Sequence, residues 1–227
     1  MALCFGWLIV RSIYIVVSDW HVPNLQHPSL GRFVRSSVEE VALLALAVYV
    51  LHRQGRTMVD LGFSSTTAAG AISVMPRVSD LFPAVYLTFG AIAARYVFWY
   101  GFVIVTWLSG IHLHSQAMNV GFAHVARSDI LIRSAAALVV VVNAIYEESL
   151  VRAYLMTEVV YFTRKPWLAL FVSVIVQSSY HLYQGVLPAF SDLALFFVFA
   201  FFYMRTGRIW PVIFAHMLLD VIAMFMS

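Results

Sequence analysis

The chain has few charged residues and almost no cysteine. Only 11% of its 227 residues are charged, whereas a soluble domain carries about 25%. The single cysteine, Cys4, excludes an intrachain disulfide and a metal site built from cysteines. No dense basic run accompanies the net charge of +3, so a nucleic-acid-binding protein is not indicated. We therefore interpret the chain as an integral membrane protein with little mass outside the bilayer.

Hydrophobic residues make up 62% of the chain and gather in continuous runs. Such runs predict membrane-spanning helices, because a β-barrel would alternate with a period of two. The first run lacks a small-residue cleavage site with a polar region after it, which favours a span over a cleaved signal peptide. The sequence thus predicts an all-α, polytopic transmembrane bundle of about seven helices, in one domain that covers residues 1–227. The expected spans are 3–17, 38–51, 82–108, 131–162, 167–183, 188–203 and 209–226.

Two longer connectors are expected, at 18–37 and 52–80, where proline, glycine and polar residues are frequent. The second contains Leu61-Gly62-Phe63 and is typical of an amphipathic or re-entrant segment. Lysine and arginine concentrate in the loops after the second, fourth and sixth spans, which the positive-inside rule assigns to the cytoplasm. We expect the protein in the plasma (inner) membrane of a prokaryotic cell.

Three charged groups, Glu147, Glu148 and Arg152, end the apolar run from Leu131 to Ile145. An ionisable group inside a membrane is costly and therefore indicates function. On a helix Glu148 and Arg152 share a face and can form an ion pair, whereas Glu147 is rotated by about 100°. One acid is thus neutralised and the other stays available, which suits a general base beside a structural pair.

Two further polar sites follow in the later spans. His181 lies in the fifth expected span, and His216 and Asp220 share one face of the last. In that pair the carboxylate can orient the imidazole or help hold a developing oxyanion. If the fourth helix runs unbroken to about residue 162, all three sites fall at similar depths, at about 1.5 Å per residue. We expect them to line one catalytic cavity within the membrane.

Each site taken alone also has a structural interpretation. A glutamate–arginine pair can hold a bundle together, and a histidine in a span can be a packing residue. Arg95, near the middle of the third span, is expected to find a partner or water inside the bundle. The histidines of the next loop, His112, His114 and His124, are expected to be solvated. The joint occurrence of the first three sites in spans of low charge favours function.

The order and spacing of these motifs resemble the CAAX protease and bacteriocin-processing family, intramembrane glutamic proteases related to the type II CAAX prenyl endopeptidase. The resemblance covers roughly residues 131–227, the expected catalytic core, and Leu61-Gly62-Phe63 resembles a Leu-Gly element found upstream in bacterial members. Two positions depart from the family pattern: Gln177, where Phe is usual, and Ala153, where Gly is frequent. The three motifs read Glu147-Glu148-Ser149-Leu150-Val151-Arg152, then Ser178 to Gly185 around His181, and His216-Met217-Leu218-Leu219-Asp220.

The resemblance implies an intramembrane endopeptidase that acts on a membrane-associated peptide or protein. Glu147 and His181 would activate a water for attack on the peptide carbonyl. His216 and Asp220 would stabilise the oxyanion, with Asp220 in the place of an Asn seen in many relatives. Arg152 would fix the acidic pair. No cofactor is implied; a zinc site built from Glu147, His181 and His216 stays open, although no His-Glu-x-x-His pair supports it.

Two other classes of function stay open. In a transporter the same residues would form a proton or ion relay, but the hydropathy shows neither the broken helices nor the inverted repeats of that class. In a catalytically silent scaffold or immunity protein the acidic and histidine residues would not be needed, and their presence argues against it.

Overall fold

Helices dominate the computed structural model, which describes residues 6–17, 29–63, 65–66, 72–110 and 129–226. The α-helices are α1 (Trp7–Val17), α2 (Leu30–Arg53), α3 (Leu81–Leu108), α5 (Ile130–Glu148), α6 (Thr157–Thr163), α7 (Pro166–Tyr180), α8 (Val186–Thr206) and α9 (Trp210–Met226). The shorter elements are an antiparallel pair, β1 (Ser65–Thr66) and β2 (Ile72–Ser73), two 3₁₀ turns, η2 (Val78–Asp80) and η4 (His181–Gln184), and a π-helical segment, η3 (Ser149–Met156). The all-α fold class is confirmed.

Three of the described helices are long and apolar enough to cross a membrane: Val78–Leu108, Ile130–Thr163 and Val186–Thr206. The first joins η2 to α3, and the second joins α5, η3 and α6 into one rod of 34 residues. The last helix is apolar but shorter. α2 is long, with 24 residues, but it carries both basic and acidic side chains. The protein is therefore an integral membrane protein whose helices differ in their fit to the bilayer.

The N-terminal half of α2 corrects the expected loop at 18–37. Of this loop, residues 18–28 lie outside the described part of the chain, and the helix begins at Leu30 instead of residue 38. Side chains four positions apart stabilise the first half of this helix. Arg35 Nε lies 2.7 Å from Glu39 Oε1, and the hydroxyl of Ser36 donates to Glu40 over 3.1 Å. The polar composition that suggested a loop is that of an amphipathic helix.

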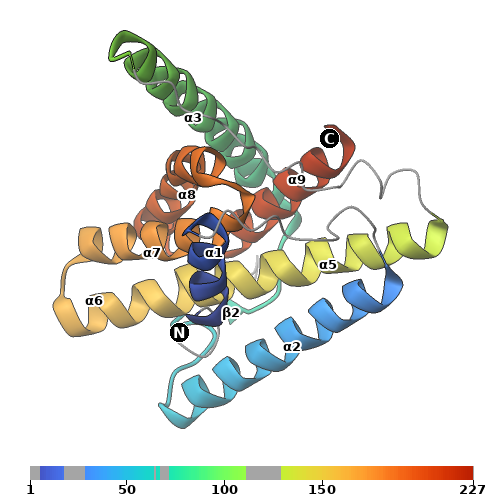
Figure 1. Ribbon diagram of the computed structural model, residues 1–227. Helices are drawn as coiled ribbons and strands as arrows, with labels where there is room; N and C mark the ends of the chain where they lie inside the picture. The colour runs from blue at the N-terminus through green and yellow to red at the C-terminus, as the bar shows by residue number, and fades with distance from the viewer. Residues whose placement is uncertain (1–5, 18–28, 64, 67–71, 111–128, 227) are drawn as a thin grey trace.

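The rod formed by α5, η3 and α6 is the axis of the arrangement (Figure 1). Helix α2 lies along α5, and α9 crosses it, while α7 packs against η3 and α6. Helix α3 packs against α8 and α9 and then extends beyond the bundle (Figure 1). The main apolar core includes Leu170 of α7, Phe199 of α8 and Ile213 of α9, each 0% exposed. This packing brings the ends of α5 and α7 together with the middle of α9.

The connector with Leu61-Gly62-Phe63 is fixed to the turn between α8 and α9. The hydroxyl of Tyr203 donates to the carbonyl oxygen of Leu61 over 3.1 Å. The N–H of Ile209 donates to the carbonyl oxygen of Gly62 over 3.2 Å. Gly62 has a φ of +78°, which favours glycine. The amphipathic segment expected here is a compact turn whose Leu61 is buried.

Candidate active site

The predicted ion pair between Glu148 and Arg152 is present and fully buried. Glu148 Oε2 lies 3.3 Å from Arg152 Nε, and both side chains are 0% exposed. Arg152 also donates through Nη2 to the carbonyl of Phe196 in α8 over 3.4 Å, and its guanidinium lies over the Phe196 ring. A buried charge is tolerated when it is paired in this way. The pair therefore ties the end of α5 to α8.

The backbone that carries this pair is not a regular α-helix. Residues Ser149–Met156 form a π-helical segment directly after the two glutamates. The unbroken rod expected to residue 162 is confirmed, since Ile130–Thr163 is continuous, but the π-segment was not predicted. Such segments are rare and frequently occur at functional sites. In the sequence, charged residues at the end of an apolar run indicate a functional site. They do not indicate that the backbone there is π-helical.

Glu147 faces α7, from which it accepts two hydrogen bonds. The hydroxyl of Tyr180 donates to Glu147 Oε2 over 2.7 Å, and Gln177 Nε2 donates to the same oxygen over 3.2 Å. Glu147 is 7% exposed and Tyr180 4%. The expectation that Glu147 turns away from Arg152 is met, but its partners were missed. Tyr180 directly precedes His181 in the second motif, and that adjacency was the available signal.

His216 of α9 contacts Glu148 and not Glu147. Its Nδ1 lies 2.8 Å from Glu148 Oε1, so this carboxylate holds Arg152 with one oxygen and His216 with the other. His216 Nε2 lies 3.8 Å from Asp220 Oδ1, within ion-pair reach but too far for a hydrogen bond. His216 is thus linked to the acid that also holds Arg152, and the shared face of His216 and Asp220 is confirmed.

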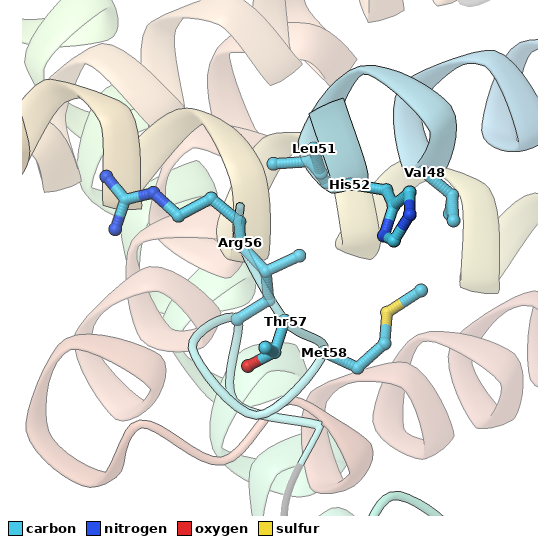
Figure 2. Close-up of a pocket in the computed structure, with 7 residues that line it drawn as sticks. Val48, Leu51, His52, Arg56, Thr57 and Met58 are labelled. Carbon is cyan, nitrogen blue, oxygen red and sulfur yellow. The ribbon is translucent and has the colours of Figure 1, made fainter. Parts of the chain in front are cut away.

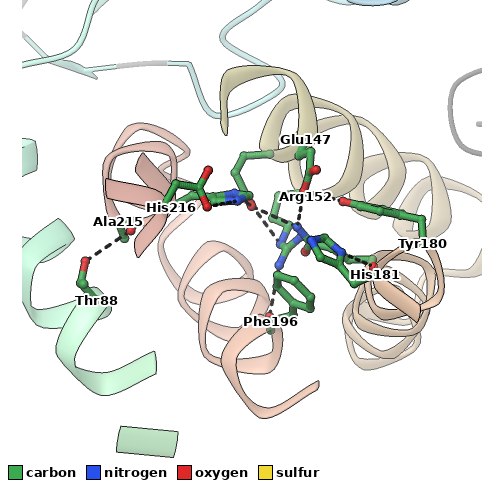
Figure 3. Close-up of polar contacts among 11 residues, drawn as sticks. Thr88, Glu147, Arg152, Tyr180, His181, Phe196, Ala215 and His216 are labelled. Atoms are coloured by element: carbon green, nitrogen blue, oxygen red, sulfur yellow. Dashed lines mark hydrogen bonds and ion pairs between the residues drawn. The ribbon is translucent and has the colours of Figure 1, made fainter. Parts of the chain in front are cut away.

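His181 lies just beyond α7, as the first residue of η4. The expected span to residue 183 thus ends as an α-helix at Tyr180. His181 Nδ1 lies 2.9 Å from the carbonyl of Gln177, and its ring lies against Tyr180 and Phe196, with centroids 4.7 and 5.0 Å away. An Nδ1–H that donates to this carbonyl leaves Nε2 of the neutral ring able to accept a proton. Figure 3 shows Glu147, Arg152, Tyr180, His181 and His216 in one cluster.

Arg95 finds a partner, as expected for a cation in a span. Its Nε lies 2.9 Å from Asp192 Oδ1 of α8 and 3.3 Å from the hydroxyl of Ser191. The Arg95 side chain is 42% exposed and that of Asp192 7%. This pair joins α3 to α8. His112, His114 and His124 lie outside the described residues.

Within the described part of the chain, no three His, Cys, Asp or Glu side chains are grouped closely enough to hold a metal ion. A separate cavity of about 330 Å³ opens at the end of α2, between Val48, Leu51 and His52 and the turn at Met58 (Figure 2). At this turn the N–H of Thr57 donates to Asp60 and holds the pKa of that carboxyl below its ordinary value. The cavity expected around the acidic cluster stays a prediction.

The comparison with protein families points to the same segment as the motifs. Residues 130–222 match the family described as Type II CAAX prenyl endopeptidase Rce1-like. No curated protein and no solved structure matches the chain. The matched residues begin with α5 and extend into α9, so they include the acidic pair, His181, His216 and Asp220. This match supports the resemblance to the CAAX protease and bacteriocin-processing family for residues 130–222, which are less than half of the chain.

Proposed function

We propose that the protein is an intramembrane glutamic endopeptidase that hydrolyses a peptide bond of a membrane-associated peptide or protein. The observation that carries this proposal is that the first and third motifs meet at Glu148, while the second reaches Glu147 through Tyr180, the residue before His181. Glu148 contacts Arg152 and His216 with its two oxygens, and Glu147 beside it is bonded to the end of α7, where His181 follows.

In the proposed reaction Glu147 is the general base. A carboxylate that no cation neutralises can take a proton from water as the water becomes a nucleophile. The hydroxide that results attacks the carbonyl carbon, and the proton passes to the leaving amine as the peptide C–N bond breaks. His181 would assist by accepting or returning a proton at Nε2. Its Nδ1 contact with the carbonyl of Gln177 supports this tautomer.

His216 and Asp220 would stabilise the oxyanion of the tetrahedral intermediate. An imidazolium that is held at Nδ1 by Glu148 carries a second proton at Nε2, on the side of Asp220. A donor fixed before the reaction stabilises developing charge without reorganisation during the reaction. Arg152 and Glu148 would serve to orient His216 and need not touch the substrate.

The proposed reaction uses no metal ion, and its substrate is a membrane-bound peptide such as a prenylated C-terminus or a bacteriocin-like leader. We place the protein in the plasma membrane of a prokaryotic cell. Incubation of the purified protein with a metal chelator is expected to leave cleavage unchanged. A loss of cleavage that zinc restores would replace this mechanism by the zinc version.

The decisive experiment is cleavage of quenched fluorescent peptides anchored in liposomes, with and without a prenyl group, by the purified protein. We expect cleavage by the wild type and by Glu39→Ala, which removes an exposed acid of α2, and none by Glu147→Ala. Cleavage by Glu147→Ala at the wild-type rate would refute the assignment of the base. If the wild type cleaves none of the anchored peptides, a transporter or a scaffold function would be favoured over the protease.

A further inference from the structure

Gln177 of α7 is fully buried between the two glutamates. It is 0% exposed, and its Nε2 lies 3.2 Å from Glu147 Oε2 and 3.3 Å from Glu148 Oε1. A primary amide has two N–H donors, so it can bind one oxygen of each carboxylate at the same time. Because both acceptors are carboxylate oxygens, the nitrogen and not the oxygen of the amide must face them.

The same residue reaches the second motif through its backbone. The carbonyl oxygen of Gln177 lies 2.9 Å from His181 Nδ1. Gln177 thus contacts both acids with its side chain and His181 with its main chain. A phenylalanine, the residue expected at this position from the family resemblance, would offer the same carbonyl but no donor to the acids. The side chain of Gln177 is therefore a feature of this chain that the shared motifs do not supply.

Two neighbouring carboxylates repel each other when both are ionised, and this repulsion favours protonation of one of them. A hydrogen-bond donor shared by both has the opposite effect, since it stabilises each charged form. We propose that Gln177 is a positioning residue that couples Glu147 to Glu148, holding Glu147 in its ionised, proton-accepting state beside the structural acid. This inference rests on the proposed function, in which Glu147 is the base.

Other charged and titratable groups also surround Glu147. They come from its own rod, from α2, from α7 with η4, and from α9, and of these groups the Gln177 side chain contacts only Glu148. They are Glu148 and Arg152, then Glu40, then Tyr180, His181 and Tyr183, and finally His216 and Asp220. A shift in proton uptake caused by substitution of Gln177 alone is therefore attributable to its amide.

Gln177→Met tests the proposal, because methionine has a similar length but no N–H donor. The substitution keeps the backbone carbonyl that holds His181. Ser173→Ala is the matched control, since Ser173 lies one turn earlier in α7 and is also 0% exposed. Gln177→Glu is the second variant, used as well in case the methionine protein does not fold, because it keeps the shape of glutamine and replaces the donor with a third acid.

Two measurements are made on each protein in detergent. One is the pH profile of peptide cleavage, and the other is the protonation of the buried carboxyls, followed by infrared spectroscopy across the same pH range. The acid limb is the low-pH side of the cleavage profile, and the infrared midpoint is the pH at which half of the infrared change has occurred. For Gln177→Met we expect both to move to higher pH by about one to two units, the effect of losing one hydrogen bond to a charged group. Gln177→Glu should move them at least as far, and Ser173→Ala should not move them.

The outcomes separate the two proposals. If the wild type cleaves peptides and neither Gln177 variant moves the acid limb or the infrared midpoint, the coupling is refuted and the protease function stands. If the wild type cleaves nothing but the infrared midpoint of the Gln177 variants moves relative to Ser173→Ala, the coupling of the glutamates stands and the protease function falls. Equal shifts in Gln177→Met and Ser173→Ala would indicate a general packing effect and would also refute the coupling.

Discussion

Glu148 and His216 are joined by a 2.8 Å contact between Oε1 and Nδ1, although 68 positions separate them in the sequence. The other carboxylate oxygen of Glu148 faces Arg152 at 3.3 Å. Glu148 therefore links α5, α8 and α9, because Arg152 in turn donates to Phe196. Its two oxygens are occupied by Arg152 and His216, which is why we assign the proposed base to the adjacent Glu147.

Arg152→Ala is expected to lower both stability and activity. It removes the cation from a pair whose side chains are 0% exposed, so the Glu148 charge is left buried and unpaired. Loss of one partner of a buried pair costs about 3–5 kcal/mol. Thermal unfolding in detergent measures the effect, with Arg35→Ala as control because its pair with Glu39 is exposed. An unchanged melting temperature for Arg152→Ala would show that water reaches the pair.

Tyr180→Phe is expected to reduce kcat by about 10- to 100-fold, because it removes a hydrogen bond to the charged base, worth about 1.5–3 kcal/mol. The bond is the 2.7 Å contact from the Tyr180 hydroxyl to Glu147 Oε2. Tyr203→Phe is the control, since it loses a bond to the carbonyl of Leu61 far from the acids. The control should lower the melting temperature while kcat per folded molecule stays unchanged. The tyrosine contact would be catalytically irrelevant if both variants kept full kcat.

The sequence predicts the parts of this arrangement that depend on local spacing. The pair of Glu148 with Arg152 and the shared face of His216 and Asp220 follow from a helical repeat. The continuous rod of α5, η3 and α6 follows from the long apolar run in its sequence. The need of Arg95 for a partner follows from its place in the apolar span of α3. These features require no knowledge of how the helices pack.

The parts that sequence reasoning missed depend on contacts between helices. Which acid His216 meets is decided by the rotation of α9 against α5, and the donors to Glu147 come from α7. Periodicity gives each helix an apolar face but does not give the angle at which two such faces meet. The early start of α2 was missed for a different reason, because a polar amphipathic helix and a loop have similar composition.

Gly62→Ala is expected to destabilise the protein strongly through the connector. A Cβ at this position would overlap the carbonyl oxygen of Gly207, which is backbone and cannot move aside easily. The φ of +78° adds left-handed strain, worth about 1–2 kcal/mol, to an overpacking cost of about 1–3 kcal/mol. Gly55→Ala isolates the strain, since Gly55 has a φ of +72° and no atom within 4 Å of its Cβ position.

Denaturant or thermal unfolding of the two glycine variants gives the comparison. Gly62→Ala should lose clearly more stability than Gly55→Ala. If the two lose the same amount, the connector does not need its close approach to the α8–α9 turn. The Leu-Gly element would then be a flexible linker in solution and not a fixed contact.

Asp220→Asn is expected to keep most of the activity, whereas Asp220→Ala should lose about 10²–10³-fold in kcat, the usual effect of removing a group from an oxyanion site. The reason lies in the geometry of His216. Glu148 already fixes its ring through Nδ1, and Asp220 stands 3.8 Å from Nε2, too far to orient the ring by a hydrogen bond. An amide at position 220 therefore keeps a polar group near the oxyanion without disturbing His216.

The two Asp220 variants also distinguish two ways in which this carboxylate can act. Cleavage rates are compared at saturating peptide, so that the difference reports kcat and not binding. If Asp220→Asn falls as far as Asp220→Ala, the negative charge itself is required, and Asp220 acts by stabilising an imidazolium at His216. If the asparagine variant retains activity and the alanine variant does not, hydrogen bonding at this position is sufficient. The second result is the one that we expect, because Glu148 already supplies a carboxylate in direct contact with His216.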